Sequence, residues 1–330
     1  MSKQFQRLTL IAIVVALGVI VLGAWVRLSH AGLGCPDWPG CYGQLTWPAV
    51  PVEIEAANEA FPERPVEGAK AWKEMVHRYL AGTLVLLVVA LCWQAWRNPL
   101  CRPARGLATA ILGLIIFQAL LGMWTVTLKL LPVIVMAHLL GGLATFALLL
   151  WMRLRVRAGP TYRPGPQVRR MRRWVLLGLT VLTLQIALGG WTSANYAAMA
   201  CPDLPTCMNR WWPDTDFREG FVLLREIGVD YEGGILDQPA RIAIHLTHRI
   251  GAVVTLLTLL LVAFRAAQAS PLKNTAMLLI ALVIIQFMLG LQNVWLGLPL
   301  ANAVAHNGVA ALLVAVMVTL LSRTTTGKNR

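Results

Sequence analysis

Residues 35–41 read CPDWPGC, and residues 201–207 read CPDLPTC, 166 positions further along the chain. A second pattern recurs at nearly the same offset, because residues 118–126 read QALLGMWTV and residues 286–294 read QFMLGLQNV. Glutamine, glycine and valine keep the same spacing in both copies. The chain therefore contains one layout twice, and its fold is expected to be an internal repeat.

The composition indicates a membrane protein. The chain has 330 residues, of which 57% are hydrophobic and only 13% are charged. Apolar runs of about 20 residues match a bilayer core about 30 Å thick, at about 1.5 Å of rise per residue. Eight such runs are present, at about 8–28, 75–96, 107–128, 133–152, 174–193, 241–264, 275–296 and 301–321. The first run resembles a signal peptide but lacks a small-residue cleavage site, so we expect a retained helix.

The net charge of +14 is explained by membrane orientation, and no nucleic-acid partner is expected. With eight spans, the basic clusters all fall on one side, at positions 3–7, 97–105, 153–173, 265–273 and 323–330. All 15 acidic residues fall in the opposite loops or at their edges. Because basic loops face the cytoplasm, both termini are predicted to be cytoplasmic.

The predicted fold is an all-α polytopic membrane protein with eight transmembrane helices, arranged as two repeated four-helix bundles. The first half spans residues 1–156 and includes an outer loop at 29–73. A cytoplasmic linker rich in Arg, Pro and Gly follows at 157–173. The second half spans 174–330 and includes an outer loop at 194–240. An even number of spans per half makes the two repeats parallel in topology.

Four histidines occupy equivalent places in the repeat, two in each half. They are His77 and His138 in the first half and His248 and His306 in the second. Each lies inside an apolar run near its outer end, and two facing imidazoles suit axial ligation of a haem iron. Zinc or copper more often takes three or four ligands in close array, which this spacing does not provide. The alternative is a set of neutral histidines that hydrogen-bond between helices.

Glu74 and His245 mark a difference between the two halves. Each lies three residues before a repeated histidine and therefore shares a helix face with it. A carboxylate at this place can move protons or stabilise positive charge, which would give the first half the chemistry and the second half an electron-transfer cofactor. The alternatives are a solvated residue at a helix start for Glu74, and an interfacial residue or an extra ligand beside His248 for His245. His30 is expected to be a loop residue.

Two cysteine pairs lie in the predicted outer loops. They are Cys35 with Cys41 and Cys201 with Cys207. Five residues, two of them prolines, separate the members of each pair, which favours a local bridge that closes the loop in an oxidising compartment. The spacing differs from the CxxC of thioredoxin-like enzymes, although a redox-active pair or a metal site is also compatible with it. Cys92 and Cys101 have no predicted partner.

These residues together resemble the haem A synthase family, the CtaA-type membrane haem O oxidases. The resemblance rests on GAWVRLS at 23–29, GLGCPDWPGC at 32–41, EMVHRY at 74–79, AHL at 137–139, HR at 248–249 and AH at 305–306. It covers nearly the whole chain. Each motif alone is weak, whereas their combination is specific.

The resemblance implies an oxidoreductase that oxidises a ring methyl group of haem O to the formyl group of haem A, for haem-copper terminal oxidases. His248 and His306 would hold a resident haem b, and His77 and His138 would face the substrate haem. Glu74 would be catalytic. The outer cysteine pairs match positions where family members carry cysteines.

Arg78 and Arg249 each follow a repeated histidine, so they are predicted either to pair with haem propionates or to anchor the chain at the interface. The expected partners are haem O, the haem O synthase that supplies it, an unidentified electron donor and the lipid bilayer. A homo-oligomer is compatible with the sequence. The expected location is a bacterial inner membrane, crossed several times.

Three other functions compete with this one. A di-haem b electron-transfer protein, such as a quinol-linked cytochrome, explains four histidines but leaves the Glu74 asymmetry without a role. A quinone-linked thiol oxidoreductase explains the CPDxPxC loops but leaves the histidines unused. A transporter built on parallel repeats predicts a polar site at the midplane on broken helices, whereas these histidines lie toward the outer side.

Overall fold

The computed structural model describes residues 2–158 and 163–325, so residues 159–162 of the predicted linker and the last five residues of the predicted second half lie outside it. Within this part of the chain, eight helices are long and apolar enough to cross a membrane, as predicted. They are α1 (Lys3–Leu28), α3 (Gly68–Arg97), α4 (Arg105–Thr127), α5 (Pro132–Ala158), α7 (Arg172–Ala194), α9 (Gln238–Ala267), α10 (Lys273–Trp295) and α11 (Leu300–Thr324). The described residues contain no β-strand beyond two isolated bridges.

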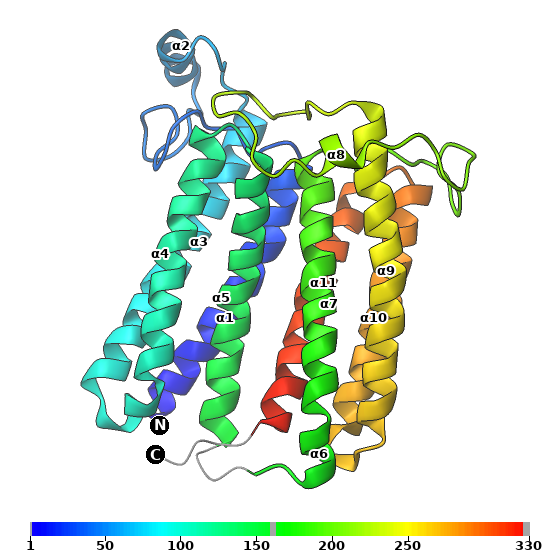
Figure 1. The fold of residues 1–330 in the computed structure, drawn as a ribbon. Helices are drawn as coiled ribbons and strands as arrows, with labels where there is room; N and C mark the ends of the chain where they lie inside the picture. Colours follow the sequence, from blue (N-terminus) through cyan, green and yellow to red (C-terminus); the bar gives the residue numbers. More distant parts are fainter. Residues whose placement is uncertain (1, 159–162, 326–330) are drawn as a thin grey trace.

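Short helices occupy the connections. They are α2 (Pro51–Ala60), α6 (Pro166–Arg170) and α8 (Phe217–Gly220), with 3-10 turns η1 (Pro99–Ala104) and η2 (Ser270–Leu272). α1 begins and α11 ends at the same end of the molecule, as an even number of spans requires (Figure 1). The long connections that contain α2 and α8 lie at the opposite end (Figure 1).

The long helices form two closed rings of four. In the first ring, α1 packs against α3, α3 against α4, α4 against α5, and α5 against α1. In the second ring, α7, α9, α10 and α11 pack in the same cyclic order. α1 and α5 of the first ring contact α11 and α7 of the second, so these four helices form the centre of the molecule. The sequential order of packing produces two antiparallel four-helix bundles joined side by side.

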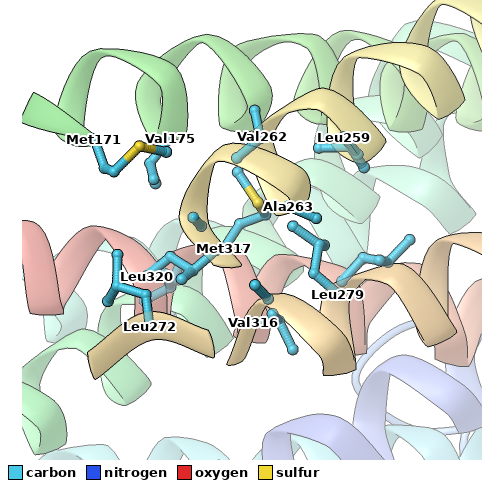
Figure 2. Close-up of a cluster of buried hydrophobic side chains, with 14 of the residues drawn as sticks. Met171, Val175, Leu259, Val262, Ala263, Leu272, Leu279, Val316, Met317 and Leu320 are labelled. Carbon is cyan, nitrogen blue, oxygen red and sulfur yellow. The ribbon is translucent and has the colours of Figure 1, made fainter. Parts of the chain in front are cut away.

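Each bundle is densely packed at the end away from the long loops. Figure 2 shows this core in the second bundle, where side chains such as Met317, Val262 and Leu279 converge from different helices. The first bundle has a matching core that includes Phe5, Leu91 and Ile111. These apolar side chains anchor the helices relative to one another, so that the loop ends of the bundles are held at a fixed spacing.

The histidine-bearing ends are less densely filled. α5 lies in the centre of the molecule, yet all ten residues at 133–142 are only half-buried. In α11, none of the residues at 304–310 is buried either. Side chains at this level of both bundles are therefore more exposed than those of the cores at the other end.

The two long outer connections hold each other across the halves. Arg64 forms ion pairs with Asp230 at 3.0 Å and with Glu232 at 2.9 Å, and Tyr231 between them is buried. The backbone N–H of Tyr231 donates to the carbonyl oxygen of Lys129, in the short turn between α4 and α5. The second outer connection therefore extends over the first bundle.

Candidate functional site

The four repeated histidines lie on diagonally opposite helices of the two rings. In the first ring, His77 lies on α3 and His138 on α5. In the second, His248 lies on α9 and His306 on α11. The rings of each pair are close enough to interact electrostatically. The structure thus brings the predicted residues together as two separate pairs, each facing across the core of one bundle.

In the first bundle, each histidine packs against a glycine of a neighbouring helix. A Cβ added to Gly23 on α1 would lie 2.9 Å from Cε1 of His77. A Cβ added to Gly122 on α4 would lie 3.4 Å from Cε1 of His138. All four helices therefore contribute to the site, because two supply imidazoles and two supply the space in which those rings lie.

The second bundle repeats this arrangement. A Cβ added to Gly189 on α7 would lie 3.1 Å from Cε1 of His248, and one added to Gly290 on α10 would lie 3.3 Å from Cε1 of His306. The use of glycine at all four positions became visible only when the helices were paired.

The polar atoms of the histidines fit a metal-bound prosthetic group. Nδ1 of His77, His138 and His306 is buried and has no hydrogen-bond partner in the protein. Two imidazoles on opposite helices of one bundle, each packed against a glycine, suit a haem held from both faces. No group of three or more His, Cys, Asp or Glu side chains arranged for a metal ion occurs in residues 2–158 and 163–325, which disfavours a zinc or copper site.

Glu74 is buried within a helix, so its interpretation as a solvated residue at a helix start is wrong. α3 begins at Gly68, seven residues before the predicted apolar run, because its first turns are polar and extend beyond the apolar span. Glu74 is only 5% exposed. One carboxylate oxygen accepts the N–H of Cys35 at 3.0 Å, and the other accepts Nη2 of Arg78 at 2.5 Å.

Arg78 connects Glu74 to the first cysteine loop. Its Nη1 donates to the carbonyl oxygens of Asp37 at 2.9 Å, of Pro39 at 3.2 Å and of Gly40. The guanidinium, with five donors in a rigid fork, therefore fastens the loop to α3.

The second bundle has the same fastening with one substitution, because His245 stands where the first bundle has Glu74. Nδ1 of His245 lies 3.3 Å from the N–H nitrogen of Cys201, and its Nε2 lies 3.3 Å from Nε of Arg249. Arg249 also donates to the carbonyl oxygens of Cys201 at 2.6 Å and Thr206 at 2.9 Å. A neutral imidazole accepts only one hydrogen bond, whereas a carboxylate accepts several. The position suits a carboxylate better, and only the first half has one.

The propionate role of Arg78 and Arg249 stays a prediction. In the structure, both guanidiniums bind loop carbonyl oxygens, and Arg78 is also neutralised by Glu74. His245 faces the loop backbone and Arg249, so the structure gives it a loop-fastening contact of its own, distinct from the facing pair of His248 and His306.

Replacing the fastening arginines should loosen the cysteine loops. In Arg249→Lys, the single ammonium cannot reach both carbonyl oxygens and His245 together, so the Cys201–Cys207 disulfide should be reduced faster by dithiothreitol. Arg78→Lys should have the same effect on Cys35–Cys41. Mass spectrometry after timed alkylation measures both rates in one sample. Each variant serves as the control for the other, and equal rates in wild type and variants would contradict the fastening role.

Both cysteine pairs form disulfides, the pairing that their spacing predicts. Cys35 is bonded to Cys41, and Cys201 to Cys207. All four cysteines are at most 1% exposed, which shields the sulfurs from attacking thiolates. The free Cys92 and Cys101 are buried near the opposite end of the first bundle.

An aspartate closes each disulfide loop. Asp37 accepts the N–H groups of Tyr42 at 2.6 Å and Gly43 at 2.8 Å. Asp203 accepts those of Met208 at 2.7 Å and Asn209 at 3.0 Å. The Asp of the CPDxPxC motif is thus a turn-forming residue, a role that the sequence reasoning did not assign.

The second loop should loosen in acid. The Thr206 hydroxyl, followed by the N–H groups of Asn209 and Met208, holds the pKa of Asp203 below its usual value. Because the folded pKa is depressed, the stabilisation is complete above the unfolded pKa and is lost as pH falls below about 4. Hydrogen exchange at Met208 and Asn209 should accelerate over that range beyond its intrinsic pH dependence. In Asp203→Asn the additional acceleration should disappear, and its persistence would show that another group is responsible.

His30 lies just after α1, as expected for a loop residue, and stacks on Tyr196 with ring centroids 5.8 Å apart. Tyr196 also lies under the guanidinium of Arg27, at 4.3 Å from Cζ to the ring centroid. Nη2 of Arg27 donates to the carbonyl oxygen of Ser193 at 2.6 Å. His30 is therefore part of the contact between the two halves and does not join either histidine pair.

Comparison with known proteins connects this geometry to one family. The sequence profile of the COX15-CtaA family, described as cytochrome oxidase assembly protein, matches residues 6–318. A Heme A synthase from Shewanella oneidensis is 45% identical over 317 residues, which cover 96% of each chain. A Heme A synthase from Caulobacter vibrioides is 28% identical, covering 90% of this chain and 89% of the relative. One from Alkalihalophilus pseudofirmus is 25% identical, covering 96% of each chain.

Proposed function

The chain belongs to the COX15-CtaA family of cytochrome oxidase assembly proteins, and on this basis we propose that it is a haem A synthase. It is a multi-pass membrane oxidoreductase whose substrate is haem O and whose product is haem A. The observation that carries this proposal is the pair of facing histidines in each bundle, seated against glycines, in a chain 45% identical to a Heme A synthase over 96% of its length.

We assign different roles to the two bundles. His248 and His306 would hold a resident haem b, and His77 and His138 would receive the substrate haem. The assignment is supported by Glu74, because the first bundle alone has a buried carboxylate one turn before a repeated histidine. When bound, haem b would supply one-electron transfer.

In the first bundle, two successive hydroxylations would convert a ring methyl group of haem O to a hydrated aldehyde, which loses water to give the formyl group. The four electrons removed from the carbon would pass to dioxygen or, where water supplies the oxygen, to the separate electron carrier. His77 and His138 would orient the substrate from both sides. Glu74 would accept a proton or stabilise positive charge as the methyl carbon is oxidised. Its own charge is balanced by Arg78, whose ion pair with the carboxylate is 2.5 Å long.

The proposed setting is a bacterial inner membrane with both termini in the cytoplasm, so that the two disulfide loops lie in the oxidising compartment. A haem O synthase would supply the substrate, and a separate electron carrier would exchange electrons with the second bundle. These partners follow from the chemistry, since haem O must be made before it is oxidised.

The proposal is tested on the purified full-length protein and on membranes. A pyridine haemochrome spectrum should contain the haem b signal, and cells that also produce haem O should accumulate haem A, measured by chromatography of extracted haems. A protein without haem b, or one with haem b that never yields haem A, would overturn the proposal. The second outcome would favour a di-haem electron-transfer protein.

A further inference from the structure

The two bundles differ next to His248. Nε2 of Gln185 on α7 lies 3.0 Å from Nδ1 of His248 and 3.0 Å from its carbonyl oxygen. The equivalent position in the first half, 166 residues earlier, is Val19. Nδ1 of His77 is accordingly buried without a partner. One bundle thus provides its α9 histidine with an amide, and the other leaves the matching imidazole unsupported.

A second substitution makes room for that amide. A Cβ added to Gly251 would lie 2.2 Å from Oε1 of Gln185, so any larger residue at 251 would displace the glutamine. The equivalent residue of α3, three after His77, is Leu80. Gln185 and Gly251 therefore occupy the positions that Val19 and Leu80 have in the first half. Because both residues differ together, the contact between Gln185 and His248 is a specific feature of the second bundle.

The glutamine beside the other ligand does not give this support, because in the second bundle it approaches Nε2, the nitrogen that would bind iron. Nε2 of Gln286 lies 3.2 Å from Nε2 of His306. Its counterpart Gln118 instead lies over Gly141, where an added Cβ would be 1.9 Å from Nε2, and that Nε2 is buried without a partner. The residue equivalent to Gly141 is Val309.

An amide beside Nδ1 matters because of imidazole chemistry. A histidine that binds iron through Nε2 carries its proton on Nδ1, and an acceptor at Nδ1 orients the ring and increases its basicity. Oε1 of Gln185 is buried and unpartnered. Because the two ends of an amide have the same shape, a half-turn presents Oε1 to Nδ1. The His248 carbonyl then gives up its contact with Gln185 but keeps its place in the helical ladder.

We propose that Gln185 is a positioning residue that makes the second bundle a permanent haem site. The first bundle, which has Val19 at the equivalent position, is a site from which haem can exchange. A resident cofactor requires a ligand that stays bound. A substrate haem must enter and leave, which a less supported imidazole permits. This inference rests on the proposed function. It explains why one copy of the repeated site retains its haem and the other copy releases it.

The first test copies the first bundle into the second. Gln185→Val combined with Gly251→Leu installs the pair of residues that the first bundle has beside His77. Transfer of haem b from the purified protein to apomyoglobin should become about 10- to 100-fold faster, as for other lost hydrogen bonds to metal-ligating histidines. The midpoint potential of haem b should rise, because a less basic imidazole stabilises ferric iron less. An unchanged transfer rate and potential would overturn the proposal.

A conservative variant covers the case in which that double variant does not fold. Gln185→Glu keeps the shape and presents a stronger acceptor to Nδ1, so the potential should fall below that of wild type. A potential equal to wild type, or above it, would count against the positioning role. A merely structural glutamine would not produce opposite shifts in the two variants.

The reciprocal exchange is Val19→Gln with Leu80→Gly in the first bundle. It should increase the amount of haem O and haem A that co-purifies with the protein, relative to haem b. Failure of this inference is distinguishable from failure of the proposed function. In the first case, wild type contains haem b and makes haem A, but the Gln185 variants retain normal haem transfer and potential. In the second, wild type itself lacks one of those properties.

Discussion

Glu74→Gln should stop the conversion of haem O to haem A while leaving haem b in place. The carboxylate lies three residues before His77 on α3, on the same helix face. It is 5% exposed and accepts hydrogen bonds from the Cys35 N–H and from Arg78. A carboxylate has about four acceptor sites, so it keeps capacity to take a proton or face a developing positive charge.

The expected loss is about 10²- to 10⁴-fold in rate, the usual contribution of a positioned acid or base. Glutamine retains one acceptor oxygen, which allows the Cys35 N–H or Arg78 to stay bound, so the loop should keep its place. Extracted haems from cells that also make haem O measure the product, and a pyridine haemochrome spectrum measures retained haem b.

The matched control is His245→Gln, at the equivalent position of the second bundle. It perturbs the same fastening contacts, to Cys201 and Arg249, without touching the first bundle. Haem A formation should persist in this control. A normal yield of haem A in Glu74→Gln would refute the catalytic role, and an equal loss in both variants would reduce Glu74 to a fastening residue.

Sequence patterns predicted best those structural features that depend on a single helix. Apolar length was enough for all eight spans, since a bilayer demands it. The helix ends were less well predicted, because α3 and α9 continue beyond their apolar portions, to Gly68 and Gln238. The short helix α2 was missed, although Pro51 at its first turn and Glu53 two residues later are start signals that could have been used.

Contacts between segments were beyond the reach of sequence patterns. Arg78 was expected at a propionate or at the interface, and its contacts with the carbonyl oxygens of Asp37 and Pro39 depend on how the loop folds back onto α3. Gln185 was overlooked for a similar reason. It lies 63 positions before His248, and only the pairing of α7 with α9 brings them together.

Removing one histidine from each pair should separate the two roles. His306→Ala should lose haem b, because the remaining ligand on α9 would hold the iron from one side only. His138→Ala should keep haem b at the wild-type ratio to protein and yet make no haem A. Both substituted positions lie six residues after the first residue of their helix, which is Pro132 in α5 and Leu300, preceded by Pro299, in α11, so the two variants are structurally matched.

The readout for both variants is the haem composition of purified protein, determined by haemochrome spectroscopy and by chromatography after growth with a haem O source. If His138→Ala loses haem b and His306→Ala retains it, the assignment of the bundles is reversed. If both variants lose the same kind of haem to the same extent, the two sites are equivalent. Glu74 would then not indicate a difference in function between the bundles. Only loss of haem b in His306→Ala, together with loss of haem A formation alone in His138→Ala, assigns the resident haem to the bundle that contains Gln185 and the reaction to the bundle that contains Glu74.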